Sequence, residues 1–141
     1  MIFDQDQRLL IVERGHEPLK GFWSLPGGVV QTGETLAEGI AREVLEETGL
    51  IVEPGEIVEI FERIMRDDQG RAEYHYVLVD YICRVTGGSL AAADDVSDVR
   101  WVSKQDLHGI RLTEGTLAVI EKAYSILLCN EPAPTFSSTK S

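Results

Sequence analysis

One stretch of the sequence, Thr35 to Gly49, carries a complete set of helix signals. Thr35 is followed three residues later by Glu38, which is the spacing of a capping box, and Gly49 stands where a glycine commonly ends a helix. Between these ends, apolar residues recur at helical spacing: Leu36, Ala37, Ile40, Ala41, Val44 and Leu45. The pattern predicts a helix over residues 36–48 that packs its apolar side against the rest of the fold.

Three glutamates, Glu43, Glu46 and Glu47, lie within little more than one turn of this predicted helix. At about 100° per residue they share an arc of roughly 100°. Like charges at these spacings oppose helix formation by roughly 0.2–0.5 kcal/mol per pair. A hard cation would offset this repulsion, because Mg²⁺ takes its oxygen ligands from a few carboxylates and from substrate phosphates. A solvated, charge-rich helix face is the alternative interpretation.

The residues around the glutamates favour the cation site. Gly27-Gly28 permits close backbone approach, so a carbonyl oxygen there could reach a metal or a phosphate group. Arg42 could pair with Glu46, four residues further on, or reach back to Glu34 in the preceding loop. The second pairing would hold the loop against the helix.

The rest of the sequence consists mainly of β-rich runs. Strands are expected at residues 8–14, 57–66, 74–85 and 99–102, and a second helix at residues 113–128. The turn-forming cluster Asp67-Asp68-Gln69-Gly70 joins two of these strands into a hairpin. There are no internal repeats and no linker, so we expect one α/β (α+β) domain over residues 1–128, followed by a mobile tail at residues 129–141.

The composition limits the partners of this domain. A formal charge of −11 argues against non-specific nucleic-acid binding, which needs a positive field, so an anionic ligand would require a mediating cation. No run is long and apolar enough to span a membrane, and the N-terminal residues show no signal-peptide pattern. Cys83 and Cys129 have no metal-type spacing and are expected to be reduced. These observations predict a cytoplasmic protein with no nucleic-acid or membrane partner.

Gly28, Glu34 and the run from Arg42 to Leu50, REVLEETGL, together resemble the Nudix box, with every defining position filled. The resemblance covers about Leu9 to Ala123 and includes RGHEPLKGFWSLPGG upstream and the WVS segment at Trp101. It implies a Nudix-type α/β/α sandwich with a mixed central sheet. It also implies hydrolysis of a pyrophosphate bond that depends on a divalent metal, as in the bacterial ADP-ribose pyrophosphatases and MutT-like proteins.

The resemblance also implies roles for individual residues. Arg42 and Glu34 would form an orienting ion pair, and either Glu46 or Glu43 would serve as the general base. Mg²⁺ or Mn²⁺ would neutralise the pyrophosphate and activate the attacking water. The implied metal ligands are the carbonyl oxygen of Gly27 and the side chains of Glu43, Glu46 and Glu47.

Four further residues are candidates for substrate contact, and three of them have a structural alternative. Arg14 would meet a phosphate or base, or is a surface arginine at the end of a strand. Trp23 would wall a nucleobase pocket, or belongs to the core. Gly28 would lie against a phosphate. Asp95, with Asp94, would supply an additional acidic ligand or base from a late loop, or belongs to a solvated turn.

The substrate itself is left open by the sequence. ADP-ribose, cleaved to AMP and ribose 5-phosphate, is the first choice, although the proline that marks many ADP-ribose hydrolases is absent and Met65 and Arg66 occupy its region. A MutT-like pyrophosphohydrolase of normal or oxidised nucleoside triphosphates is the alternative, and a non-catalytic nucleotide sensor is a third. Only Met1-Ile2-Phe3 precedes the first turn, so either the first strand is short or the true N-terminus lies upstream of Met1. A second subunit in a homodimer is expected to cover the weakened sheet edge.

Overall fold

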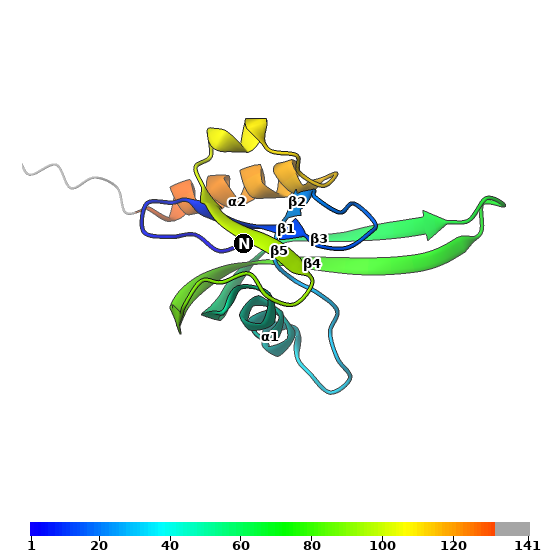
Figure 1. Ribbon diagram of the computed structural model, residues 1–141, viewed down its shortest axis with the longest axis horizontal. Helices are drawn as coiled ribbons and strands as arrows, with labels where there is room; N and C mark the ends of the chain where they lie inside the picture. Colours follow the sequence, from blue (N-terminus) through cyan, green and yellow to red (C-terminus); the bar gives the residue numbers. More distant parts are fainter. Residues whose placement is uncertain (132–141) are drawn as a thin grey trace, which may run out of the picture.

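The computed structural model describes residues 1–131, in which two α-helices enclose two antiparallel sheets (Figure 1). One sheet has the strand order β2-β1-β5 and the other is the β3–β4 hairpin. This arrangement confirms the predicted α+β sandwich. In chain order the elements are β1 (Leu9–Arg14), β2 (Trp23–Ser24), α1 (Leu36–Thr48), β3 (Leu50–Arg66), β4 (Ala72–Gly88), β5 (Val96–Val102), the 3₁₀ helix η1 (Asp106–Gly109) and α2 (Thr116–Asn130).

The first three residues link the two sheets. Ile2 bridges Cys83 of β4 in the parallel sense, and Phe3 bridges Leu9 of β1 in the antiparallel sense. The backbone N–H of Leu10 also donates to the carbonyl oxygen of Ile2 (2.9 Å). The segment therefore makes isolated bridges in place of a full strand, and the Ile2–Cys83 bridge supplies the parallel contact expected of a mixed sheet.

Strand β1 packs against both helices, since its successive side chains point to opposite faces of the sheet. Leu9 and Ile11 belong to a buried cluster with Val119 and Ile120 of α2. Leu10 belongs to a second cluster with Val44 of α1. The sequence of β1 is apolar on both faces for this reason, and it positions α1 on one side of the sheet and α2 on the other.

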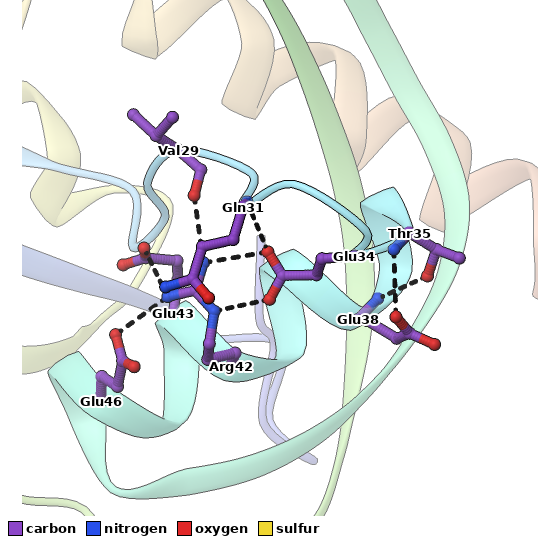
Figure 2. Close-up of polar contacts among 8 residues, drawn as sticks. All are labelled: Val29, Gln31, Glu34, Thr35, Glu38, Arg42, Glu43 and Glu46. Carbon is purple, nitrogen blue, oxygen red and sulfur yellow. Dashed lines mark hydrogen bonds and ion pairs between the residues drawn. The ribbon is translucent and has the colours of Figure 1, made fainter.

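Helix α1 has the bounds and the capping that the sequence predicts. The Thr35 hydroxyl accepts a hydrogen bond from the Glu38 N–H (3.1 Å), and the Glu38 carboxylate accepts one from the Thr35 N–H (3.0 Å) (Figure 2). At the other end Gly49 has a φ of 74° and donates to the carbonyl oxygen of Leu45. Both ends of the helix are thus fixed, and with them the positions of its three glutamates.

Several predicted boundaries differ from those observed. Strand β3 begins at Leu50 and not at residue 57, because the chain accommodates Pro54 through an irregularity in the pairing with β4. Strands β4 and β5 are likewise longer than expected, at Ala72–Gly88 and Val96–Val102.

Helix α2 also differs from the prediction at both ends. It begins at Thr116, because Gly115 adopts a φ of 81° at its N-cap, and it continues to Asn130, so residues 129 and 130 of the predicted tail are helical. The mobile tail expected at residues 132–141 lies outside the described residues. No helix within residues 1–131 is both long enough and apolar enough to cross a bilayer.

Gly49 provides a test of how the helix joins the sheet. Its φ lies in the left-handed region, and a Cβ there would overlap with the carbonyl oxygen of Ser89. We expect Gly49→Ala to lower the free energy of unfolding by about 2–4 kcal/mol, measured by urea denaturation. Gly109→Ala, where a Cβ meets nothing within 4 Å, is the control and should change it by less than about 0.5 kcal/mol. Equal losses in the two variants would contradict this account.

Candidate active site

Arg42 ties the loop before α1 to the helix (Figure 2). Its Nε donates to Glu34 Oε1 (2.6 Å) and its Nη2 to Glu34 Oε2 (3.1 Å), which makes a two-pronged ion pair. Nη2 also donates to the carbonyl oxygen of Val29 (3.0 Å), while the Gln31 N–H donates to Glu34 (2.8 Å). The hydrogen bonds from Arg42 and then from Gln31 lower the pKa of Glu34. The pair expected to orient the loop is therefore formed.

The remaining nitrogen of Arg42 contacts two of the three clustered glutamates. Nη1 donates to Glu43 Oε1 (2.9 Å) and to Glu46 Oε2 (3.1 Å). Hydrogen bonds to Glu34 and then to Glu43 raise the pKa of Arg42, so the guanidinium stays charged. Both pairings left open by the sequence, with Glu34 and with Glu46, are present together. Arg42 therefore offsets much of the repulsion between Glu43 and Glu46.

Glu47 has a different environment from the other two glutamates. It is 7% exposed, and its Oε2 accepts a hydrogen bond from the backbone N–H of Gly27 (3.1 Å). Burial raises its pKa to about 7, against the effect of the Gly27 hydrogen bond, and the charges of Glu43, Asp95 and Asp94 raise it further. Within residues 1–131 no cationic side chain forms an ion pair with Glu47. A bound cation would compensate this buried carboxylate.

The Gly27-Gly28 turn lies directly against the glutamates. Gly27 contacts Glu47 through its N–H, and a Cβ added at Gly28 would overlap with the carboxylate of Glu43. A side chain at residue 28 would therefore displace Glu43. The structure explains the glycine at this position by the close approach that the sequence suggested.

An acidic loop after β4 lies beside Glu47. Its backbone N–H groups donate to the end of α1: Ala91 to the carbonyl oxygen of Thr48 (2.9 Å) and Ala93 to that of Glu47 (3.1 Å). These bonds place Asp94 and Asp95 close enough to Glu47 to raise its pKa. A hydrogen bond with Asp95 is the main cause of a raised pKa at Asp94. The pairing of this loop with the helix end has no signal in the sequence pattern.

A cavity of about 120 Å³ opens beside Glu47. Arg14, Gly27, Glu47 and Asp95 all line it, so four residues singled out in the sequence meet here. His16 also lines the cavity, although the sequence analysis did not select it. The sequence feature that could have identified His16 is its position two residues after Arg14, which lines the same cavity. The remaining lining residues are Val12, Ser24, Leu25 and Val96.

Trp23 does not belong to this cavity. It is 7% exposed and lies in the hydrophobic core with Leu9, Ile11 and other residues of the α2 side. The guanidinium of Arg100 lies 4.6 Å from the centre of its ring. Of the two alternatives for Trp23, the structure places the side chain in the core and not among the residues that line this cavity, and the substrate contact stays a prediction.

The side chains on α1 are chemically suited to a hard divalent cation, but their positions in this structure do not form a metal site. They are carboxylates, with backbone groups of Gly27 and Gly28 beside them, which is the oxygen-rich set that Mg²⁺ prefers. In the described residues, however, no three acidic, histidine or cysteine side chains converge on a common point. Glu43 and Glu46 turn toward Arg42, while Glu47 turns toward Gly27. A cation held by Glu43 and Glu46 would have to replace Arg42 Nη1 as the contact of their carboxylates.

Comparison with known proteins decides the family, because residues 1–123 match the model of the NUDIX domain. The chain belongs to the Nudix family. It is 35% identical over 106 residues to a protein of Methanocaldococcus jannaschii named ADP-ribose pyrophosphatase, which covers 75% of this chain and 60% of that protein. It is 32% identical over 104 residues to a putative 8-oxo-dGTP diphosphatase of Bacillus subtilis (strain 168), covering 73% and 62%.

A solved structure gives the same assignment. The Nudix domain of Shewanella oneidensis NrtR in complex with ADP ribose is similar with a TM-score of 0.70 and 28% identity, over 89% of this chain and 83% of that one. The chain spans only about three fifths of the length of the two curated relatives above. Nudix hydrolases generally use a divalent metal.

The raised pKa of Glu47 predicts a pH-dependent stability in the absence of metal. The folded protein holds the Glu47 proton up to a pKa of about 7, whereas the unfolded chain releases it near 4.5. The contribution of the protonated Glu47 to the free energy of unfolding is therefore fully present below pH 4.5. It is lost as the pH rises through about 7, which lowers the free energy of unfolding by up to about 3 kcal/mol. Urea denaturation of wild type and Glu47→Gln should show that only wild type has this contribution. Parallel pH profiles for the two proteins would contradict the assignment.

Proposed function

We propose that the chain hydrolyses a pyrophosphate bond in a nucleoside diphosphate linked to another moiety, with a divalent cation held by Glu43, Glu46 and Glu47. The observation that carries the proposal is the buried carboxylate of Glu47, which has a pKa raised to about 7 and lies beside Gly27 within a complete Nudix box. A buried carboxylate that lowers stability is retained where it serves a function. The cavity next to it supplies room for phosphate oxygens.

The chemistry divides among a few side chains. Mg²⁺ or Mn²⁺, when bound, would neutralise the pyrophosphate and lower the pKa of a water molecule. Glu46 or Glu43 takes the proton of the attacking water, and the two remain alternatives. Arg42 and Glu34 hold the loop against α1, so that Gly27 and Gly28 stay next to the carboxylates. Arg14, which lines the same cavity as Glu47, would contact a phosphate oxygen of the substrate.

ADP-ribose is the substrate that the comparisons support best. The M. jannaschii relative is named an ADP-ribose pyrophosphatase, and the S. oneidensis domain was solved with ADP ribose. Addition of one water across the pyrophosphate would yield AMP and ribose 5-phosphate. The B. subtilis relative, a putative 8-oxo-dGTP diphosphatase, supports the alternative of a MutT-like enzyme that acts on normal or oxidised nucleoside triphosphates. A nucleotide sensor without turnover is the third candidate.

One assay separates these functions. Product release is measured across ADP-ribose, other nucleotide sugars, dinucleotides and normal or oxidised nucleoside triphosphates, with Mg²⁺ and then Mn²⁺. We expect ADP-ribose to give a kcat/KM at least about 10-fold above any triphosphate, and EDTA to abolish turnover. A higher value for an oxidised triphosphate would establish the MutT-like alternative. Metal-dependent binding of ADP-ribose without turnover would establish the sensor.

The compartment and the assembly of the enzyme belong to the same proposal. Both Cys83 and Cys129 are free thiols, which suits the reducing cytoplasm in which nucleotide metabolites occur. The homodimer expected from the sequence remains a prediction, as does the absence of nucleic-acid and membrane partners.

A further inference from the structure

The cavity beside Glu47 is too small to enclose a whole nucleotide. Its volume is about 120 Å³, whereas pockets that enclose drug-sized ligands measure about 300–1,000 Å³. Within residues 1–131, no Phe, Tyr or Trp side chain lines it, so it lacks the aromatic surface on which a nucleobase stacks. Most of the side chains that line it are polar or charged. The cavity therefore suits one phosphoryl group better than a base.

A phosphoryl group in this cavity needs hydrogen-bond donors, because the carboxylates of Glu47 and Asp95 also line it and repel an anion. Three lining side chains can donate: Arg14, His16 and Ser24. The Ser24 hydroxyl already faces the carbonyl oxygen of the next residue (3.5 Å). The side-chain donors that remain for a ligand are those of Arg14 and His16.

Arg14 and His16 differ in how much of their hydrogen-bonding capacity is used. The Arg14 Nε donates to the carbonyl oxygen of Pro18 (3.0 Å), which holds the guanidinium in place and leaves its two Nη groups for a ligand. Among residues 1–131, the one histidine side chain that forms a hydrogen bond is that of His75. The His16 imidazole therefore reaches the cavity with both ring nitrogens available.

The backbone on either side of His16 is held in place. The Gly15 N–H donates to the carbonyl oxygen of Asp95 (2.8 Å). At the other end of the loop, the Gly21 N–H donates to the carbonyl oxygen of Arg14 (2.9 Å). A Cβ at Gly15 would lie 2.8 Å from the Asp95 oxygen, so the chain comes this close only with glycine there. His16 is thus placed next to the acidic loop before any ligand binds.

We propose that His16 is a substrate-contacting residue, which donates a ring N–H to a phosphoryl oxygen in this cavity. The inference rests on the proposed function and adds to it a residue that contacts phosphate and not the base. Arg14 contacts the same phosphoryl group through its Nη groups. In a chain with a formal charge of −11, such donors have to be placed locally, where the anion lies. Because every candidate substrate contains a pyrophosphate, the contact serves ADP-ribose and the triphosphates alike.

The test measures binding without turnover, by isothermal titration calorimetry in the presence of Mg²⁺. One ligand is α,β-methylene-ADP, a nucleoside diphosphate whose bridge resists hydrolysis, and the other is methylenediphosphonate, which has neither base nor ribose. We expect His16→Ala to raise the Kd of both ligands about 10-fold, and His16→Gln, which keeps an N–H donor, to raise it about threefold. His108→Ala, an exposed histidine that lines a separate groove, is the matched control and should stay within about twofold.

The outcomes separate this proposal from the proposed function. If wild type binds both ligands and His16→Ala binds them equally well, the phosphate contact is overturned and the proposed function stands. A loss of affinity for α,β-methylene-ADP alone would place the contact on the base or the ribose, which also overturns the proposal. A wild-type protein that binds neither ligand would overturn the proposed function, and the phosphate contact with it.

Discussion

Replacing Glu47 by Gln is expected to lower kcat/KM at limiting Mg²⁺ by at least about 100-fold. The amide oxygen of Gln can still accept the hydrogen bond from the Gly27 N–H, so the turn before α1 keeps its position. What is lost is the negative charge of a buried carboxylate, which in the proposed function would bind the cation. The measurement is a Mg²⁺ titration of ADP-ribose turnover for wild type and variant. Glu53→Gln, which removes only a surface pair with Arg84, is the control and should stay within about twofold of wild type.

The same variant separates a functional loss from a folding defect. Without metal at pH 8, Glu47→Gln should be more stable than wild type, because the charge of the buried carboxylate no longer opposes folding. An inactive and more stable variant would identify Glu47 as a group retained for activity. Full activity of Glu47→Gln at limiting Mg²⁺ would refute the cation site.

Replacing Arg42 by Ala is expected to reduce kcat/KM by about 10–100-fold and to lower the melting temperature. The variant loses the two-pronged pair with Glu34 and the bond to the Val29 carbonyl oxygen, so the loop is no longer held against α1. Glu43 and Glu46 also lose the guanidinium that offsets the repulsion between their negative charges. Turnover at saturating Mg²⁺ and thermal unfolding are measured together.

Arg42→Lys is the informative companion to this variant. Lysine keeps the positive charge and lacks the planar fork that reaches Glu34 and Val29 at once. We therefore expect little recovery of activity in Arg42→Lys. If the lysine variant matched wild type, charge alone would explain the role of residue 42, and the proposed positioning of the loop would be wrong.

The local signals in the sequence account for most of α1 and its site. The capping box at Thr35 and the glycine at residue 49 determine the helix ends through hydrogen bonds between near neighbours, so they can be recognised without the fold. The pairing of Arg42 with Glu34 is also local, because the two residues are only eight positions apart and most of that interval lies in α1. Such contacts depend on spacing, and spacing is visible in a sequence.

Contacts between distant segments could not be predicted in this way. Asp95 meets Glu47 only because the loop after β4 bonds to the end of α1, and His16 joins them because Gly15 donates to the carbonyl oxygen of Asp95 (2.8 Å). For Trp23, the local sequence leaves two alternatives open. An aromatic residue near Pro-Gly-Gly is more often part of the core than of a pocket, and packing against residues distant in the sequence places Trp23 in the core.

The position of β1 between two hydrophobic clusters has a consequence for how the molecule opens. Leu9 and Ile11 support α2 while Leu10 supports α1, so neither helix can detach without disturbing the strand on which the other rests. The two halves should therefore behave as one cooperative unit in native-state hydrogen exchange, with the slowest amides in β1. Helix α1 would then exchange its amides at the rate set by global unfolding, although the cavity beside Glu47 is open to solvent.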